Sequence, residues 1–116
     1  MAGDGSLMMN LQELQTIQGY KLPVKVIVLN NNGYLSIRQT QEAYFSDNMF
    51  GIGPKDGVSL PNFVSLGNAL KISSIKVDSI DNWMNSTTQT LLNNQEPALI
   101  EIMLDPTQSF SPKLTS

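Results

Sequence analysis

The sequence has no histidine and no cysteine among its 116 residues. These two absences exclude disulfide frameworks, thiol catalysis and zinc sites built from Cys or His. They also exclude a histidine general base and any Ser-His-Asp relay within the chain. A metal bound by these residues must therefore be a hard cation held by oxygen atoms.

Basic residues and long apolar runs are also scarce. Seven Lys and Arg residues stand against ten Asp and Glu residues, and they are scattered, so no basic patch is expected for nucleic acid or an anionic membrane. The longest apolar run, at 26–29, is far too short to cross a bilayer. Met1-Ala2-Gly3 carries no sign of an export signal. We therefore predict a cytoplasmic protein without nucleic-acid or membrane partners.

The chain has the length of one domain, which can bury roughly 65% of its unfolded surface. Apolar, β-branched runs predict strands at 24–29, 72–77 and 98–104. Helices are predicted at 34–44, at 61–70 with Pro61 in the first turn, and at 79–93 with Ser79 as the cap. A further helix is expected to begin at Asn10, with Glu13 completing a capping box, and to end by Gly19.

Strands and helices alternate, and the apolar runs of the strands show no clean period of two. This pattern predicts an α/β fold, a three-layer αβα domain with a mostly parallel sheet covered on both faces. The cluster Gly3-Asp4-Gly5-Ser6 is of the kind that follows a strand, yet only Met1 and Ala2 precede it. We therefore expect an incomplete domain that belongs to a longer protein.

Two polar loops are expected at one edge of this sheet, because ligands gather at the carboxyl ends of parallel strands. Gly3-Asp4-Gly5-Ser6 offers a carboxylate, backbone N–H groups and a hydroxyl, and Asn30-Asn31-Asn32-Gly33 offers amide and carbonyl oxygens. Such groups suit Mg²⁺ or Ca²⁺ bridging to a phosphate. Taken singly, each loop is more often a plain turn.

The spacing of the two loops resembles that of thiamine-diphosphate-dependent enzymes. Their diphosphate-binding domain carries Gly-Asp-Gly and then, after a stretch of this length, Asn-Asn, which here are Gly3-Asp4-Gly5 and Asn30-Asn31. Other similar stretches lie at 12–14, 57–63 and 97–102. The likeness covers nearly the whole chain and is greatest to the acetolactate-synthase-like decarboxylases and carboligases.

By that likeness, Mg²⁺ would be bound by Asp4, by the side chain of Asn31 and by the backbone carbonyl of Gly33. The diphosphate of thiamine diphosphate would be held at the same place, by a set that comprises Gly3, Asp4, Gly5, Ser6, Asn31, Gly33, Tyr34 and Leu35. The cofactor would supply the difficult chemistry, a carbanion at its thiazolium ring. The resemblance puts the cofactor-activating glutamate on a separate pyrimidine-binding domain, so we expect no catalytic residue here and no turnover by this chain alone.

The resemblance also implies partners. These are a 2-oxo acid substrate in the full-length protein, the missing pyrimidine-binding domain or subunit, and further copies of the chain in a homo-oligomer. Residues 1–104 would form the partial diphosphate- and metal-binding domain and 105–116 a tail. An alternative is a non-catalytic remnant or interaction module that keeps the fold. A response-regulator-like domain is disfavoured, because Asp4 has no partner carboxylates nearby in sequence.

Several other side chains allow two interpretations. Glu13 is either a second carboxylate near the site or a capping or surface charge, and we favour the latter. Arg38 meets an anionic group or, as we favour, forms a surface or structural ion pair. Trp83 and Met84 are expected in the core. Thr40 stands where acetolactate synthases have tryptophan, which predicts a different and more polar pocket. The loop at 46–59 either closes over a substrate or is disordered.

Overall fold

The computed structural model of the chain describes residues 1–45 and 49–112. In these residues four strands form one sheet in the order β1–β2–β4–β3. The strands are β1 (Ala2–Gly3), β2 (Lys25–Asn30), β3 (Ser73–Val77) and β4 (Ala98–Met103). Each pairing is parallel, and β2 and β4 pair along their whole length, from Lys25 opposite Ala98 to Asn30 opposite Met103. The predicted parallel sheet is confirmed.

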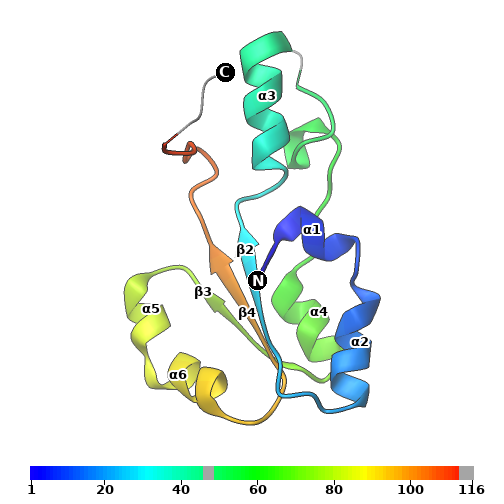
Figure 1. Cartoon of the computed structure of the whole chain (residues 1–116), viewed down its shortest axis with the longest axis vertical. Helices are drawn as coiled ribbons and strands as arrows, with labels where there is room; N and C mark the ends of the chain where they lie inside the picture. The colour runs from blue at the N-terminus through cyan, green and yellow to red at the C-terminus, as the bar shows by residue number, and fades with distance from the viewer. Residues whose placement is uncertain (46–48, 113–116) are drawn as a thin grey trace.

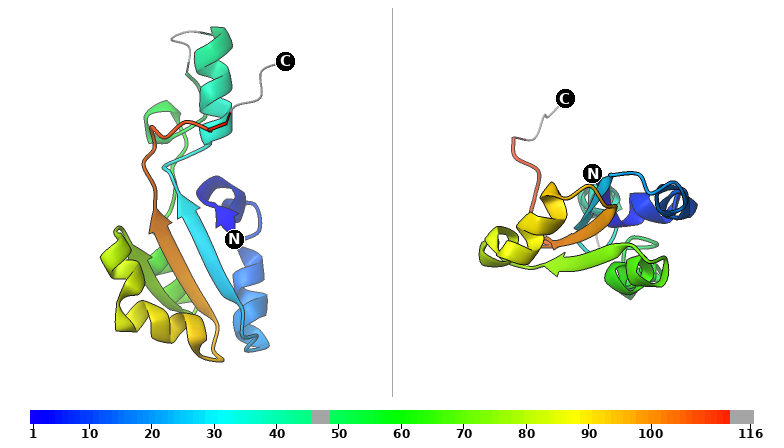
Figure 2. Two further views of the ribbon diagram at one scale, coloured as in Figure 1. Left: turned by 60° about the vertical axis from the view of Figure 1, so that its left-hand side comes forward. Right: turned by 90° about the horizontal axis from the view of Figure 1, so that it is seen from below.

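Helices cover both faces of the sheet (Figures 1 and 2). One face carries α1 (Asp4–Met8), α2 (Gln12–Gly19) and α4 (Phe63–Ala69), and the other carries α5 (Ile80–Met84) and α6 (Ser86–Asn93). Beyond the carboxyl ends of β2 and β4 lie α3 (Leu35–Phe45) and the short 3-10 helix η1 (Pro54–Asp56). The three-layer αβα architecture predicted from the alternation of elements is therefore confirmed.

The main core lies between the sheet and the layer of α1, α2 and α4. Its buried members are all apolar: Leu7, Leu14, Val28, Phe63, Ile72 and Leu99. Phe63 begins α4 and is fully buried against the sheet. The side chain of Asn62 caps this helix by accepting the Ser65 N–H at 2.9 Å. Pro61 therefore lies before the cap, and the prediction that it lies in the first turn of the helix is wrong.

Two other helix predictions differ from the structure. Asn10 does not cap α2, which begins at Gln12 after a residue that is already helical, so no capping box with Glu13 forms. The helix predicted at 79–93 is two helices, because Asn85 leaves the helical conformation and its side chain accepts the Thr88 N–H at 2.9 Å. Ser79 does cap the first of them. Met84 is 65% exposed, so its expected place in the core is wrong, whereas Trp83 is half-buried.

The first residues form the strand end that the Gly-Asp-Gly cluster led us to expect. Ala2 pairs with Val28 and Gly3 with Leu29, so β1 meets only the second half of β2. The cluster itself is not a turn but the start of α1, which begins at Asp4. Asp4 therefore stands where a strand ends and a helix begins.

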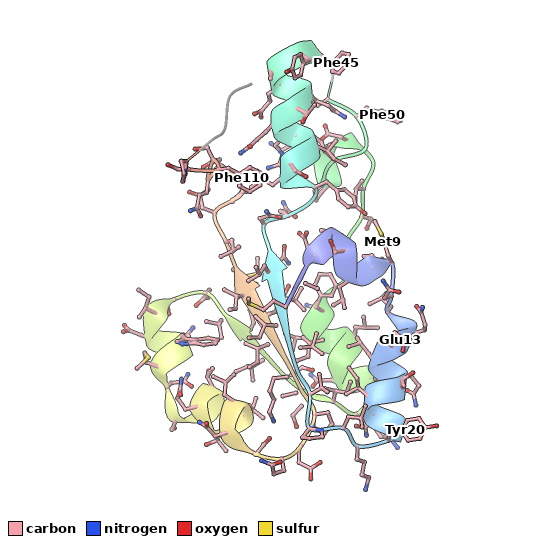
Figure 3. The ribbon with its side chains drawn as sticks, in the orientation of Figure 1. Met9, Glu13, Tyr20, Phe45, Phe50 and Phe110 are labelled. Atoms are coloured by element: carbon pink, nitrogen blue, oxygen red, sulfur yellow. The ribbon has the colours of Figure 1, made fainter. Side chains whose placement is uncertain are left out.

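Exposed aromatic and methionine side chains lie beside α2 and α3 in Figure 3. Phe45 and Phe50 lie at the far end of α3, and Met9 and Tyr20 flank α2. In the described part of the chain, none of the helices has both the length and the apolar character needed to cross a membrane.

Candidate functional site

The two predicted loops meet at the carboxyl edge of β1 and β2. Asp4 follows β1 and is 2% exposed, and Gly33 follows β2. The Gly33 N–H donates to Asp4 Oδ2 at 2.8 Å, and the Gly5 N–H donates to Oδ1 at 2.7 Å. They meet because β1 and β2 are neighbouring parallel strands whose carboxyl ends lie together.

These two donors allow the Asp4 carboxylate to be buried. A carboxylate removed from water is costly unless hydrogen bonds replace its hydration. Each carboxylate oxygen accepts one backbone N–H here, and each has a second lone pair that can bind a further partner. Asp4 is therefore held in place by two backbone donors.

Two glycines around Asp4 have close neighbours. Gly33 has φ +129°, and a Cβ there would lie 2.0 Å from the Ile52 carbonyl oxygen. That carbonyl accepts the Tyr34 N–H at 2.8 Å. A Cβ on Gly5 would lie 2.4 Å from the Tyr34 ring. At Gly33 the neighbouring backbone thus leaves no room for a side chain, and at Gly5 a side chain would require the Tyr34 ring to move.

Ile52, which we did not predict as a site residue, comes from the loop predicted at 46–59. It is 1% exposed and lies directly behind Gly33 and Tyr34. Residues 46–48 of that loop lie outside the described residues. The later part of the loop packs against the site, and neither the expected closure over a substrate nor the expected disorder is tested.

The other predicted residues lie around this centre. Gly3, Asn31 and Leu35 line one cavity of about 400 Å³, whose opposite wall is formed by residues 104–105 and 108–111. Ser6 is exposed on α1, and its Oγ lies 3.8 Å from the position of a Cβ on Gly3. The structure therefore brings all eight predicted residues to one edge of the sheet, while their binding roles stay predictions.

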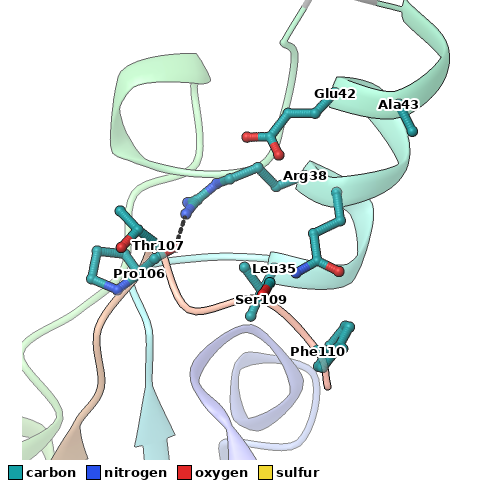
Figure 4. Close-up of a pocket in the computed structure, with 9 residues that line it drawn as sticks. Leu35, Arg38, Glu42, Ala43, Pro106, Thr107, Ser109 and Phe110 are labelled. Carbon is teal, nitrogen blue, oxygen red and sulfur yellow. Dashed lines mark hydrogen bonds between the residues drawn. The ribbon is translucent and has the colours of Figure 1, made fainter. Parts of the chain in front are cut away.

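A second cavity, of about 470 Å³, lies between α3 and the chain after β4 (Figure 4). Arg38 projects from α3 into it and donates to the backbone carbonyls of Pro106 at 2.8 Å and Asn32 at 3.3 Å. We favoured an ion pair for Arg38, but these hydrogen bonds go to neutral carbonyls. Arg38 thus ties α3 to the 30–33 loop and to the chain after β4.

The same stretch contains a carboxylate with a perturbed pKa. Hydrogen bonds from the Thr107 hydroxyl at 2.6 Å and the Thr107 N–H at 2.8 Å lower the pKa of the exposed Asp105, against a small opposing effect of burial. Because the pKa of Asp105 is lowered, its hydrogen bonds with Thr107 stabilise the 105–107 turn at pH values above the ordinary aspartate pKa. The stabilisation is lost as the pH falls through the lowered pKa.

Two further polar side chains were not predicted as site residues. Asn30 ends β2, and its Nδ2 donates to Oε1 of Glu101 on β4 at 2.7 Å. Both residues are buried, at 9% and 5% exposure. The available signal was an acidic residue within an otherwise apolar strand. Glu13, by contrast, is exposed on α2 and points away from the molecule (Figure 3), as the surface interpretation predicts.

The donor set fits a hard divalent cation with bound phosphates. In residues 1–45 and 49–112 no three His, Cys, Asp or Glu side chains form a metal-holding group. A cation beside Asp4 would therefore need amide, carbonyl and phosphate oxygens in addition. Mg²⁺ is usually bound in this way, through one or two carboxylates, waters and the phosphates of a ligand.

The parallel αβα fold and the buried carboxylate where two strand ends meet are those of an α/β domain whose ligand site lies at the carboxyl ends of its strands. Residues 1–102 match the family model "Thiamine pyrophosphate enzyme, C-terminal TPP binding domain". The chain belongs to this family.

Known relatives agree with this assignment. The acetolactate synthase large subunit of Porphyra purpurea is 31% identical over 97% of this chain, which spans 18% of that protein. The isozyme 2 large subunit of acetolactate synthase from Escherichia coli is 30% identical over 97% of the chain and 20% of its own length. Among solved structures, the thiamine diphosphate-dependent 4-hydroxybenzoylformate decarboxylase of Rhodococcus jostii RHA1 has a TM-score of 0.76 and 25% identity, over 92% of this chain and 19% of that chain. The chain thus spans about a fifth of the length of these proteins.

Proposed function

We propose that this chain binds the diphosphate of thiamine diphosphate through Mg²⁺, as one part of a decarboxylase or carboligase resembling acetolactate synthase. The observation that carries the proposal is the hydrogen bond from the Gly33 N–H to Asp4, which joins the two loops around a buried carboxylate. Family membership supports the cofactor, and the all-oxygen donor set supports the metal.

In this proposal Asp4, the Asn31 side chain and the Gly33 carbonyl bind Mg²⁺. The cation offsets the repulsion between the carboxylate and the diphosphate. The first N–H groups of α3, an eleven-residue helix that begins at Leu35, face the same loop and are suited to phosphate oxygens. The rest of the diphosphate site is the set already brought together by the fold: Gly3, Gly5, Ser6 and Tyr34. The bound cofactor would supply a carbanion at its thiazolium ring.

The whole protein's activity also belongs to the proposal. We infer a 2-oxo acid substrate, a pyrimidine-binding domain or subunit that completes the site, and no turnover by residues 1–116 alone. Thr40 is exposed on α3, and its hydroxyl donates to the Ser36 carbonyl at 3.1 Å. It supports a pocket unlike that of acetolactate synthase, because a large apolar ring is absent there. The boundary at residue 104 and the cytoplasmic location stay predictions.

Calorimetric titration of the chain with thiamine diphosphate, with and without Mg²⁺, tests the proposal. We expect Mg²⁺-dependent binding that Asp4→Ala and Asp4→Asn weaken by more than about 100-fold, since even partners behind a metal ligand are worth 10–100-fold. Asp81→Asn is the matched control, because Asp81 also lies in the first turn of a helix but in the opposite layer. A folded wild-type chain that shows no Mg²⁺-dependent binding would contradict the proposal and favour the non-catalytic remnant.

A further inference from the structure

Glu101 is a buried carboxylate with no part in the proposed metal site. It lies in the centre of the sheet, opposite Val28 on β2 and Lys76 on β3, and is 5% exposed. Asn30 is two residues beyond Val28, so the pleat of β2 puts its side chain on the same face as Glu101. The Asn30 amide donates to the Glu101 carboxylate at 2.7 Å.

This hydrogen bond decides which way the Asn30 amide points. The Glu101 oxygen accepts this hydrogen bond, so it selects the NH₂ group of Asn30 and turns the amide oxygen away. That oxygen accepts the Asn32 N–H at 2.9 Å. With the amide reversed, both hydrogen bonds would be lost. The amide oxygen of Asn30 would face the Glu101 oxygen, and its NH₂ group would face the Asn32 N–H.

The Asn32 N–H lies inside the loop that supplies the proposed ligands. Asn32 has φ +65° and Gly33 has φ +129°, so two successive residues adopt left-handed backbone conformations. The Gly33 N–H then reaches Asp4 at 2.8 Å. A continuous series of contacts thus runs from Glu101 through Asn30 to the loop between Asn31 and Gly33, and ends at Asp4.

We propose that Glu101 is a positioning residue: through Asn30 it fixes the 30–33 loop so that the Asn31 amide and the Gly33 carbonyl are placed for the cation. The inference rests on the proposed function, since it concerns the same site. It assigns to Glu101 no contact with the cation or the cofactor.

The test compares Glu101→Leu with Glu101→Gln in the full 116-residue chain. Leucine removes the acceptor, whereas the Gln side-chain carbonyl can still accept from Asn30. We expect Glu101→Leu to weaken Mg²⁺-dependent thiamine diphosphate binding by 10–100-fold, the usual effect of losing a partner behind a metal ligand, and Glu101→Gln to stay within about threefold of wild type. Equal affinity of folded Glu101→Leu and wild type would overturn the proposal.

Two controls separate positioning from general stability. Thr88→Val removes another buried hydrogen bond, from the Thr88 hydroxyl to the Asn82 carbonyl at 2.7 Å, far from the loop. It should lower the Tm and leave the affinity unchanged. Asn30→Ala should weaken binding at least as much as Glu101→Leu, because it also removes the acceptor of the Asn32 N–H. The double variant should be no weaker than Asn30→Ala, because Glu101 acts only through Asn30. Additive losses in the double variant would contradict action through Asn30. Asn30→Ala also provides the test if Glu101→Leu does not fold.

Hydrogen exchange of the apo chain distinguishes failure of this inference from failure of the proposed function. The Asn32 and Gly33 N–H groups should exchange slowly in wild type and Glu101→Gln and faster in Glu101→Leu, whether or not the cofactor binds. If the wild-type chain does not bind the cofactor, the proposed function fails, and these exchange rates alone judge the inference. Unchanged exchange at both groups in Glu101→Leu would overturn it.

Discussion

Gly33 shows at the residue scale how the sequence encodes the candidate site. Its left-handed φ and the Ile52 carbonyl behind it leave no room for a Cβ. We predict that Gly33→Ala lowers the free energy of unfolding by roughly 2–4 kcal/mol, from backbone strain together with the clash.

Gly51→Ala is the matched control for this prediction. Gly51 also has a left-handed φ, of +68°, but nothing lies within 4 Å of a Cβ built there. It should lower the free energy of unfolding by about 1 kcal/mol, the cost of the conformation alone. Urea denaturation of both variants measures the difference, and equal losses would show that the contact with Ile52 has no effect.

Some residues of the site could be predicted from the sequence and others could not. Asp4 and the 30–33 loop were predicted to meet on the condition that the strand before Asp4 neighbours the strand at 24–29, since the carboxyl ends of parallel strands share one edge. The pairing of β1 with β2 meets that condition. The hydrogen bond between Asn30 and Glu101 joins residues 71 positions apart and depends on strand register, which no local pattern reveals. Ile52 reaches the site through an irregular loop, for which the sequence offers no periodicity to interpret.

At the scale of elements, strands were easier to predict than helix boundaries. Strands β2, β3 and β4 agree with their predicted ranges to within one residue at each end. β2 and β4 contain nearly continuous apolar runs, as parallel strands in the middle of a sheet do, whereas β3 contains the exposed Ser73 and Lys76. The start of a helix depends on which of several nearby polar side chains accepts a hydrogen bond from its first N–H groups. Asn10 does not cap α2, whereas Asn62 and Asn85 cap α4 and α6.

The break between α5 and α6 gives a prediction at this scale. Asn85 ends one helix and caps the next, so Asn85→Ala should lower the free energy of unfolding by about 1 kcal/mol, while Asn85→Ser keeps a capping oxygen and most of the stability. Asn93→Ala, an exposed change at the other end of α6, should stay within about 0.5 kcal/mol of wild type. Thermal or urea unfolding measures all three, and an Asn85→Ala variant as stable as wild type would refute the capping role.

At the scale of the whole molecule, the edge of the sheet beside β1 bears on assembly. The edge strand β1 is short and pairs with β2 only at Val28 and Leu29. The first half of β2 therefore presents backbone groups that another strand can bind. We therefore predict self-association of the chain. Sedimentation velocity over a range of concentrations should show species larger than the 12.8 kDa monomer, and a single monomeric species at the highest concentration would contradict this.

The central claim is that Asp4 and Asn31, from two separate loops, bind one divalent cation together. A crystal structure of the chain grown with Mn²⁺ and thiamine diphosphate tests it most directly, because the anomalous signal of manganese locates the ion. We predict one ion about 2.1 Å from oxygens of both side chains and of the diphosphate. An ion bound elsewhere, or a bound diphosphate without an ion beside Asp4, would contradict the claim.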